Sequence, residues 1–316
     1  MTENTVVAMA IKSDHISVGV GIGKNLKEDG VKAGRVAAEM ALNDLEHDFS
    51  KTISYGTTVG DILRLNPFFA FVFPDSLSEQ EAILGGGSGD NLRYKETYQF
   101  YNGEVYTVDC KTDSISVHGW YPTEKSAFVT KAEGRTVYEL DHKRATEVYA
   151  SMIGMDEQEL IKRKNIAVVD NIGSKYVLSI SDIHGNRWLK HPNKAYKDGR
   201  ITFFADVPEN VVVSLNEATP ESVLKSTECA LKKIRKRFKP RICIIFYAIG
   251  RKKFLEGYNA CDEEFKIIKK HLKGVDFIGF YAFGQQGFTS TGITGHRNQT
   301  VNFFFISDEL LTKEIP

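Results

Sequence analysis

The chain has 316 residues, of which 42% are hydrophobic, and its 41 Lys and Arg residues balance 41 Asp and Glu residues. This length predicts two domains or one large one, with enough apolar residues for a core. Zero net charge gives no overall attraction to nucleic acid or anionic membranes, and no apolar run has the length of a membrane span. We expect no signal peptide, and the four widely spaced cysteines favour reduced thiols in a cytoplasm. Cys229 and Cys243 are expected to be small buried side chains.

The first part of the chain alternates strand and helix patterns. An amphipathic helix is predicted over residues 29–46, and a continuous apolar strand over residues 68–73. A short helix is expected over residues 78–84, directly before the sequence GGGSGDN. Asn102-Gly103 indicates a hairpin between two strands. The predicted strands are residues 5–11, 16–22, 96–101, 104–110, 114–120 and 126–132, and a helix over residues 141–153 closes this part.

A second block begins near residue 155 with a short charged helix to residue 164. Thr219 and Pro220 predict the start of a helix that carries an apolar stripe from Val223 to Phe238. Its basic end is read as a solvated helix terminus rather than a nucleic-acid patch, because the chain is neutral overall. A second helix is predicted over residues 259–272, and strands over residues 176–181, 200–205, 211–215, 242–247, 275–282 and 301–306.

This mixture predicts an α/β to α+β fold with two related halves, residues 1–154 and 155–316, each a mainly buried mixed sheet flanked by helices. The halves share an element order, and they can be layered against each other. GGGSGDN in the first half corresponds to FGQQGFTSTG in the second. The first half looks shortened near residues 76–85, because too few residues separate its apolar strand from its glycine segment.

Residues 284–300 are read as a polar, glycine-punctuated loop between two buried strands, which is a common place for a ligand site. The segment Gly85–Asn91 can form a nest of backbone N–H groups for an anion, or can be a tight turn capped by Asp90. His118 can bind a ligand or be a packed structural histidine, and Arg251 can hold a carboxylate or lie at the surface. The candidate ligand-binding residues are Gly86, Gly87, Ser88, Gly89, Asp90, Asn91, His118, Arg251, Tyr281, Phe283, Gly284, Gln285, Asn298, Gln299 and Thr300.

Several of these stretches resemble the FIST family. LGGGSGDNLRYKETYQFYNGEVY is similar to the signature of the family's N-terminal half, and GFYAFGQQG followed by HRNQT is similar to that of its C-terminal half. The resemblance spans about residues 5–306. It implies an intracellular sensory module that binds a small ligand such as an amino acid.

The chain departs from the family pattern in length and at three residues. The family usually has a further strand and helix before the part that matches Thr5, so compared with it the first half looks shortened at its N-terminus. Phe283-Gly284-Gln285 stands where the pattern has Tyr-Gly-Glu, which removes a hydroxyl and a carboxylate. Ala248 stands where a cysteine is common, before the retained Gly250-Arg251 pair. From the change at Phe283 and Gln285 we expect a cationic ligand group to be held differently than in relatives, or not at all. The change at Ala248 weakens any thiol chemistry.

We interpret the chain as a cytoplasmic sensor of an amino acid or a similar carboxylate, without catalysis, cofactor or metal, that signals through a separate protein. One alternative is a small-metabolite enzyme that uses His118, Asp90 and Arg251, which requires these side chains to converge. The other is a protein-interaction scaffold. No GxSxG, HExxH or metal-ligand spacing is present. We expect no nucleic acid or membrane partner.

Overall fold

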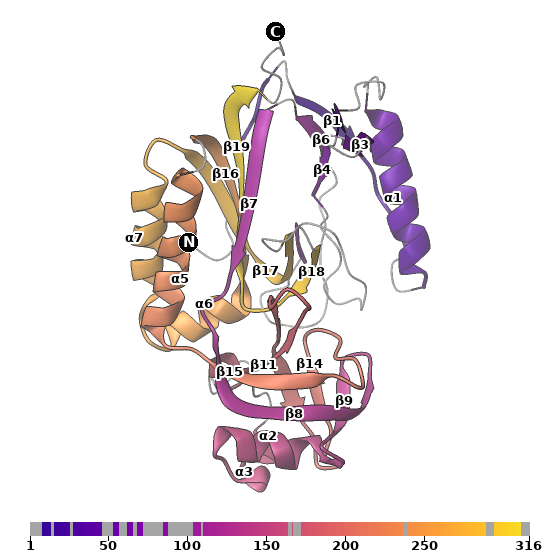
Figure 1. The fold of residues 1–316 in the computed structure, drawn as a ribbon, viewed down its shortest axis with the longest axis vertical. Helices are drawn as coiled ribbons and strands as arrows, with labels where there is room; N and C mark the ends of the chain where they lie inside the picture. The colour runs from indigo at the N-terminus through magenta and orange to yellow at the C-terminus, as the bar shows by residue number, and fades with distance from the viewer. Residues whose placement is uncertain are drawn as a thin grey trace.

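The computed structural model describes residues 8–13, 16–25, 28–45, 53–56, 62–65, 68–71, 85–87, 104–108, 110–163, 166, 172–236, 239–288 and 294–310. It has two bodies, which we call upper and lower from their positions in Figure 1. Both bodies combine sheet and helix, which confirms the α+β class.

The upper body is built on a mixed sheet with the strand order β18-β17-β16-β19-β7, to which β5 adds beside β17. Only the pair β16 and β17 is parallel among these described strands, and it is joined through helices α6 and α7. The strands are β5 (Gly85–Gly87), β7 (Cys110–Val117), β16 (Pro240–Ala248), β17 (Asp276–Phe288), β18 (Thr294–Arg297) and β19 (Val301–Leu310).

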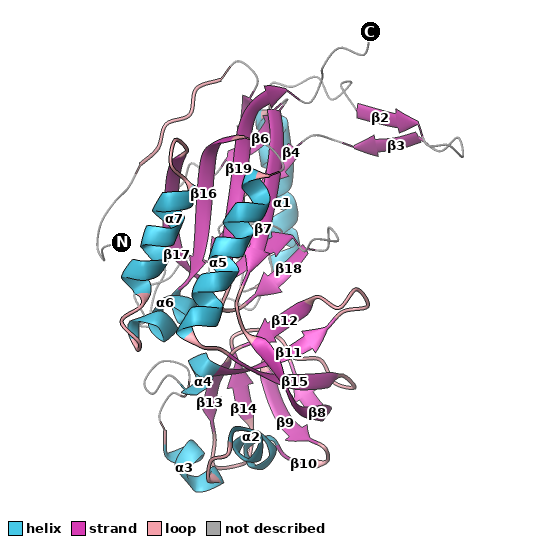
Figure 2. Cartoon of the chain, turned by 60° about the vertical axis from the view of Figure 1, so that its left-hand side comes forward, coloured by secondary structure: helices cyan, strands magenta, loops and turns pink. Residues whose placement is uncertain are grey.

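Helices cover one face of this sheet, and a small second sheet covers the other (Figures 1 and 2). Helices α5 (Pro220–Arg235) and α7 (Cys261–His271) bury Leu231, Ile234 and Ile268 against the strands. On the far face, Phe71 stacks on Phe246 and packs edge-on against Phe304. The remaining elements here are α6 (Ile249–Glu256), α1 (Gly30–Asp44), β1 (Ile16–Val20), β4 (Phe68–Ala70), β6 (Glu104–Val108) and the hairpin of β2 (Ile53–Gly56) and β3 (Ile62–Leu65).

The lower body is a curled antiparallel sheet with the order β12-β11-β15-β8-β9-β14-β13 and with β10 beside β9. Its core buries Val129, Tyr149 and Leu178. The elements are β8 (Tyr121–Glu133), β9 (Thr136–Leu140), β10 (Lys143–Arg144), α2 (Ala145–Ile153), α3 (Glu157–Lys162), α4 (Ile172–Lys175), β11 (Tyr176–Ser181), β12 (Arg187–Lys190), β13 (Pro192–Ala195), β14 (Ile201–Phe203) and β15 (Val212–Glu217).

Most expected elements in the described residues form where the pattern predicts them. Asp29 accepts from the backbone N–H of Lys32 as the N-cap of α1, and Thr219 and Ser222 form a capping box at α5. The helix predicted from residue 141 begins only at Ala145, because Asp141 and His142 have positive φ in a turn. The expected helix over residues 78–84 and the expected strand over residues 96–101 lie outside the described residues.

Four expectations need correction. The strand expected over residues 5–11 does not form in its described part, since residues 8–11 belong to no strand. The polar segment after Ala282 is not a loop throughout, since β17 continues to Phe288 and pairs with strands on both sides. Helix α6 was not predicted, because its short sequence IGRKKFLE has no clear apolar stripe. Cys243 is buried as expected, whereas Cys229 is exposed on α5.

Candidate ligand-binding site

The two glycine segments identified in the sequence lie side by side in the upper sheet. β5 pairs antiparallel with β17, so that Gly87 faces Phe283 and Gly86 faces Gln285. On its other side, β17 pairs with β18, where Arg297 is opposite Gln285. Predicted site residues more than 190 positions apart in the chain thus become neighbours. Ser88–Asn91, the rest of the first segment, lie outside the described residues.

The turn between β18 and β19 carries buried polar side chains that reach into the lower body. Asn298 and Gln299 are 4% and 1% exposed. Asn298 Oδ1 accepts from the backbone N–H of His191 at 3.0 Å, and its Nδ2 lies 3.1 Å from Nε2 of His296. Gln299 Nε2 donates to the Ser174 carbonyl at 3.3 Å. This turn therefore connects the upper sheet to the lower one.

Gln285 and Thr300 close the same turn within the upper body. Thr300 Oγ1 donates to Gln285 Oε1 at 3.1 Å, and Gln285 Nε2 donates to the Ala282 carbonyl at 3.0 Å. The backbone N–H of Ala248 donates to the Thr300 carbonyl at 3.0 Å. Both amide atoms of Gln285 thus have protein partners, and the side chain holds the turn against β17.

Two buried polar atoms beside this turn lack a hydrogen-bond partner among the described residues. They are His191 Nε2 and Gln299 Oε1, on side chains of residues that are 5% and 1% exposed. Both side chains border Gly250, where a Cβ would lie 2.3 Å from Gln299 Oε1 and 3.1 Å from His191 Nδ1. A Cβ at this position would force the end of the Gln299 side chain to move. A buried polar atom without a partner is costly, which marks this place as a candidate binding site.

We call this region the junction; it comprises residues 118–120, Ser174, Trp188, His191, Gly250 and residues 296–300. Its three histidines are uncharged at neutral pH. Burial lowers the pKa of His191 from 6.5 to about 3. Burial, with smaller contributions from Arg135 and Lys190, lowers that of His296 to about 3 as well. The pKa of His118 also falls to about 3, chiefly through burial and then through Arg297 and Arg251. Neutral imidazoles can donate or accept hydrogen bonds here.

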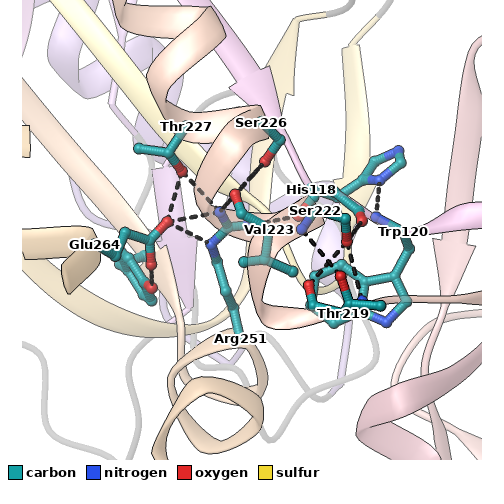
Figure 3. Close-up of polar contacts among 11 residues, drawn as sticks. His118, Trp120, Thr219, Ser222, Val223, Ser226, Thr227, Arg251 and Glu264 are labelled. Atoms are coloured by element: carbon teal, nitrogen blue, oxygen red, sulfur yellow. Dashed lines mark hydrogen bonds and ion pairs between the residues drawn. The ribbon is translucent and has the colours of Figure 1, made fainter. Parts of the chain in front are cut away.

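Arg251 is not at the surface, and its guanidinium is fully engaged (Figure 3). Its Nη2 and Nε contact Glu264 at 2.6 and 3.1 Å, and Nη2 also donates to Thr227 Oγ1 at 2.7 Å. Its Nη1 donates to the carbonyl of His118. Burial alone would lower the pKa of Arg251, but Glu264 raises it above its ordinary value. These contacts favour a structural role for Arg251 over the carboxylate clamp expected from the sequence.

His118 also has structural partners at the point where the chain passes from β7 to β8. Its Nδ1 accepts from the backbone N–H of Trp120 at 3.0 Å. Arg251 meets its carbonyl rather than its ring. The enzyme alternative required His118, Asp90 and Arg251 to converge as reactive groups. The contacts of His118 and Arg251 do not favour it, and Asp90 lies outside the described residues.

The remaining predicted residues lie on β17. Tyr281 packs edge-on against Tyr247 at 5.4 Å between ring centroids, beneath Lys252, and Phe283 is partly buried opposite Gly87. Gly284 lies between Phe283 and Gln285, where the register with β5 shifts. Tyr281 therefore belongs to the packing between β16 and β17 more than to the junction.

The sequence reasoning missed His191, His296 and Arg297 as site residues. His296 and Arg297 could have been found, because they precede Asn298 in the same polar run. His191 had no local signal in the sequence. It reaches the site only because the lower body, which carries it, contacts the turn between β18 and β19 of the upper body. The described residues contain no cluster of three or more His, Cys, Asp or Glu side chains suited to a metal ion. None of the described helices combines the length and apolarity needed to cross a membrane.

Fold and site together define an α+β protein whose sheet carries a glycine strand beside a buried polar turn. Residues 1–143 match the FIST N domain and residues 145–288 match the FIST C domain. The chain belongs to the FIST family, whose domains are sensory modules of signal transduction. This confirms the resemblance noted in the sequence.

One curated relative is the uncharacterized protein MJ1623 of Methanocaldococcus jannaschii, which is 31% identical over 204 residues. The match covers 56% of this chain and 40% of that protein, so the chain spans less than half the length of this relative. No solved structure matches the chain.

Proposed function

We propose that the protein is a cytoplasmic sensor that binds an amino acid or a similar carboxylate metabolite at the junction, without chemistry of its own. The bound state of this protein would then be recognised by a separate signalling protein. The observation that carries this proposal is a pair of buried polar atoms beside Gly250, His191 Nε2 and Gln299 Oε1, for which the described residues supply no hydrogen-bond partner.

The chemistry of these groups suits a small polar ligand. Gln299 Oε1 can accept a hydrogen bond from an ammonium or hydroxyl group, while its Nε2 is held by Ser174. Neutral His191 can donate or accept, depending on its tautomer. A ligand that satisfies both groups would remove two desolvation costs at once, which makes binding specific for polar groups at matching positions.

A thermal-shift screen of amino acids and organic acids, followed by calorimetry of the hits, tests the proposal. A ligand at about 100 times its dissociation constant should stabilise the protein by roughly 2.7 kcal/mol. Gln299→Asn shortens the amide by one methylene and tolerates the positive φ of this position, which is 59°. We expect it to weaken binding by roughly tenfold or more.

Lys111→Gln provides the control, because Lys111 pairs with Glu309 at an exposed position on β7 and β19. This variant should bind as the parent does. If no amino acid or organic acid stabilises the parent protein, the proposed sensory role in binding such ligands is wrong.

A further inference from the structure

Arg297 is a buried cation whose charge is not balanced within the described residues. It is 5% exposed. Its guanidinium lies over the Trp188 ring, 4.7 Å from the centroid, and Nη1 donates to Ser116 Oγ at 3.3 Å. Its buried Nε has no hydrogen-bond partner among the residues that the structure describes. No carboxylate in the described part of the chain forms an ion pair with it.

Arg251, the other buried arginine of this region, shows how such a charge is normally balanced. Arg251 is 0% exposed and has Glu264 as a counter-ion, together with acceptors from Thr227, Val223 and His118. Buried charges in proteins are normally paired in this way, because an unpaired ion loses its hydration without compensation. Arg297 is also buried, but the described residues provide no carboxylate to pair with it.

Nearby groups do not supply the missing charge. Among the described residues, Asp182 is the acidic group that raises the pKa of Arg297, and it lies beyond ion-pair distance. Its oxygens accept from the backbone of His184, from Asn186 and from Trp188 Nε1 at 3.2 Å. The other charged groups that act on the junction histidines are cationic, namely Arg135, Arg187, Lys190 and Arg251. The surroundings of Arg297 therefore favour an anion.

We propose that Arg297 is the anion-binding side chain of the junction and that it takes a singly charged carboxylate of the ligand. A planar guanidinium matches a carboxylate through two parallel hydrogen bonds, and stacking on Trp188 fixes its plane. This inference deepens the proposed function and rests on it.

Melting of ligand-free variants tests the charge argument. Arg297→Gln removes a charge that has no counter-ion in the described part of the chain, so the Tm should stay the same or rise. Arg251→Gln is the matched variant, because it leaves Glu264 buried without its partner, and the Tm should fall by roughly 10 °C. A fall for Arg297→Gln as large as that for Arg251→Gln overturns the inference, since Arg297 would then have a structural partner.

Anion titrations at constant ionic strength test the ligand class, with acetate, succinate, L-alanine and L-glutamate as carboxylates, and with inorganic phosphate and acetamide as comparisons. At least one carboxylate should raise the Tm of the parent protein while acetamide does not. Arg297→Gln should weaken the binding of that carboxylate roughly 10- to 100-fold.

The possible results separate the two proposals. If Arg297→Gln binds the carboxylate as well as the parent does, the sensory role stands and the assignment of Arg297 is wrong. If phosphate alone binds, the carboxylate class is wrong. If neither these carboxylates nor phosphate shifts the Tm of the parent protein, both this inference and the proposed function are overturned.

Discussion

Three histidines meet at the junction, and burial keeps all of them uncharged. His118 comes from the link between β7 and β8, His191 follows β12, and His296 lies on β18. Each has a pKa lowered from 6.5 to about 3, with burial as the largest cause. Titratable groups with such shifted pKa values are common at functional sites, which fits a ligand site in this region.

These lowered pKa values predict a stability that depends on pH. Because the folded-state pKa of each histidine lies below the 6.5 of the unfolded chain, the unfolded state binds more protons between pH 6.5 and about 3. Stability is therefore fully present above about pH 6.5 and is lost as the pH falls toward 3. Each histidine contributes at most about 1.4 kcal/mol per pH unit in that window.

Between roughly pH 7 and pH 5, His191→Gln should lower the slope of unfolding free energy against pH. The decrease should approach about 1.4 kcal/mol per pH unit, which corresponds to one proton. Urea unfolding at a series of pH values measures this slope. His184→Gln removes an exposed histidine in a turn and is the control. A slope for His191→Gln equal to that of the parent would contradict the buried, neutral state of His191.

At the scale of elements, the link between β7 and β8 is held by helices of the upper body and by α4 of the lower body. Ser222 Oγ of α5 donates to the Gly119 carbonyl at 2.8 Å, and Arg251 of α6 donates to the His118 carbonyl. Trp120 Nε1 donates to Ser174 of α4 at 2.9 Å. The link between β7 and β8 is therefore in contact with both bodies at the junction.

Gly119 should be sensitive to substitution, because two effects combine there. Its φ is +94°, and a Cβ would lie 2.6 Å from the Cα of Val223 on α5. Gly119→Ala should cost roughly 3 kcal/mol, from the left-handed conformation and from overpacking together. Gly134→Ala is the matched control, since φ is +52° and nothing lies within 4 Å of the added Cβ.

The control should lose only about 1–2 kcal/mol from the backbone conformation. Urea unfolding of both variants measures the difference. Equal losses would mean that α5 moves away without cost and that the link is not tightly packed.

For the whole molecule, the large sheet of the upper body and the large sheet of the lower body each combine strands from the two predicted domains. β7 of the first domain pairs with β19 of the second, and β8 pairs with β15. The boundary expected between residues 154 and 155 falls between α2 and α3 within the lower body. Each sheet thus depends on both segments of the chain.

We predict that residues 1–154 and residues 155–316, expressed separately, do not fold into stable domains. Each segment would expose unpaired strand edges and the apolar faces that its partner covers. Circular dichroism during thermal unfolding should show no cooperative transition for either segment alone. Co-expression of both segments should restore one, and a cooperative melt of a single segment would refute the prediction.

The elements themselves could largely be predicted from the sequence, because their signals are local. The capping residues Asp29 and Thr219 and the apolar stripe of α5 act within a few positions of each other, and the polar run HRNQT marked part of the junction. The course of β17 could not be predicted, since its polar residues form a strand only through pairing with β5 and β18.

Composition, local patterns and motifs determined the α+β class, the family and the neighbourhood of the candidate site. Only the tertiary structure decided the roles of the two arginines. Arg251 finds its partner Glu264 on another helix and the His118 carbonyl 133 positions away. Arg297 finds no carboxylate partner among the described residues. Burial and the presence of a counter-ion depend on contacts between residues far apart in the chain, so no local pattern could distinguish the structural arginine from the one proposed to bind a ligand.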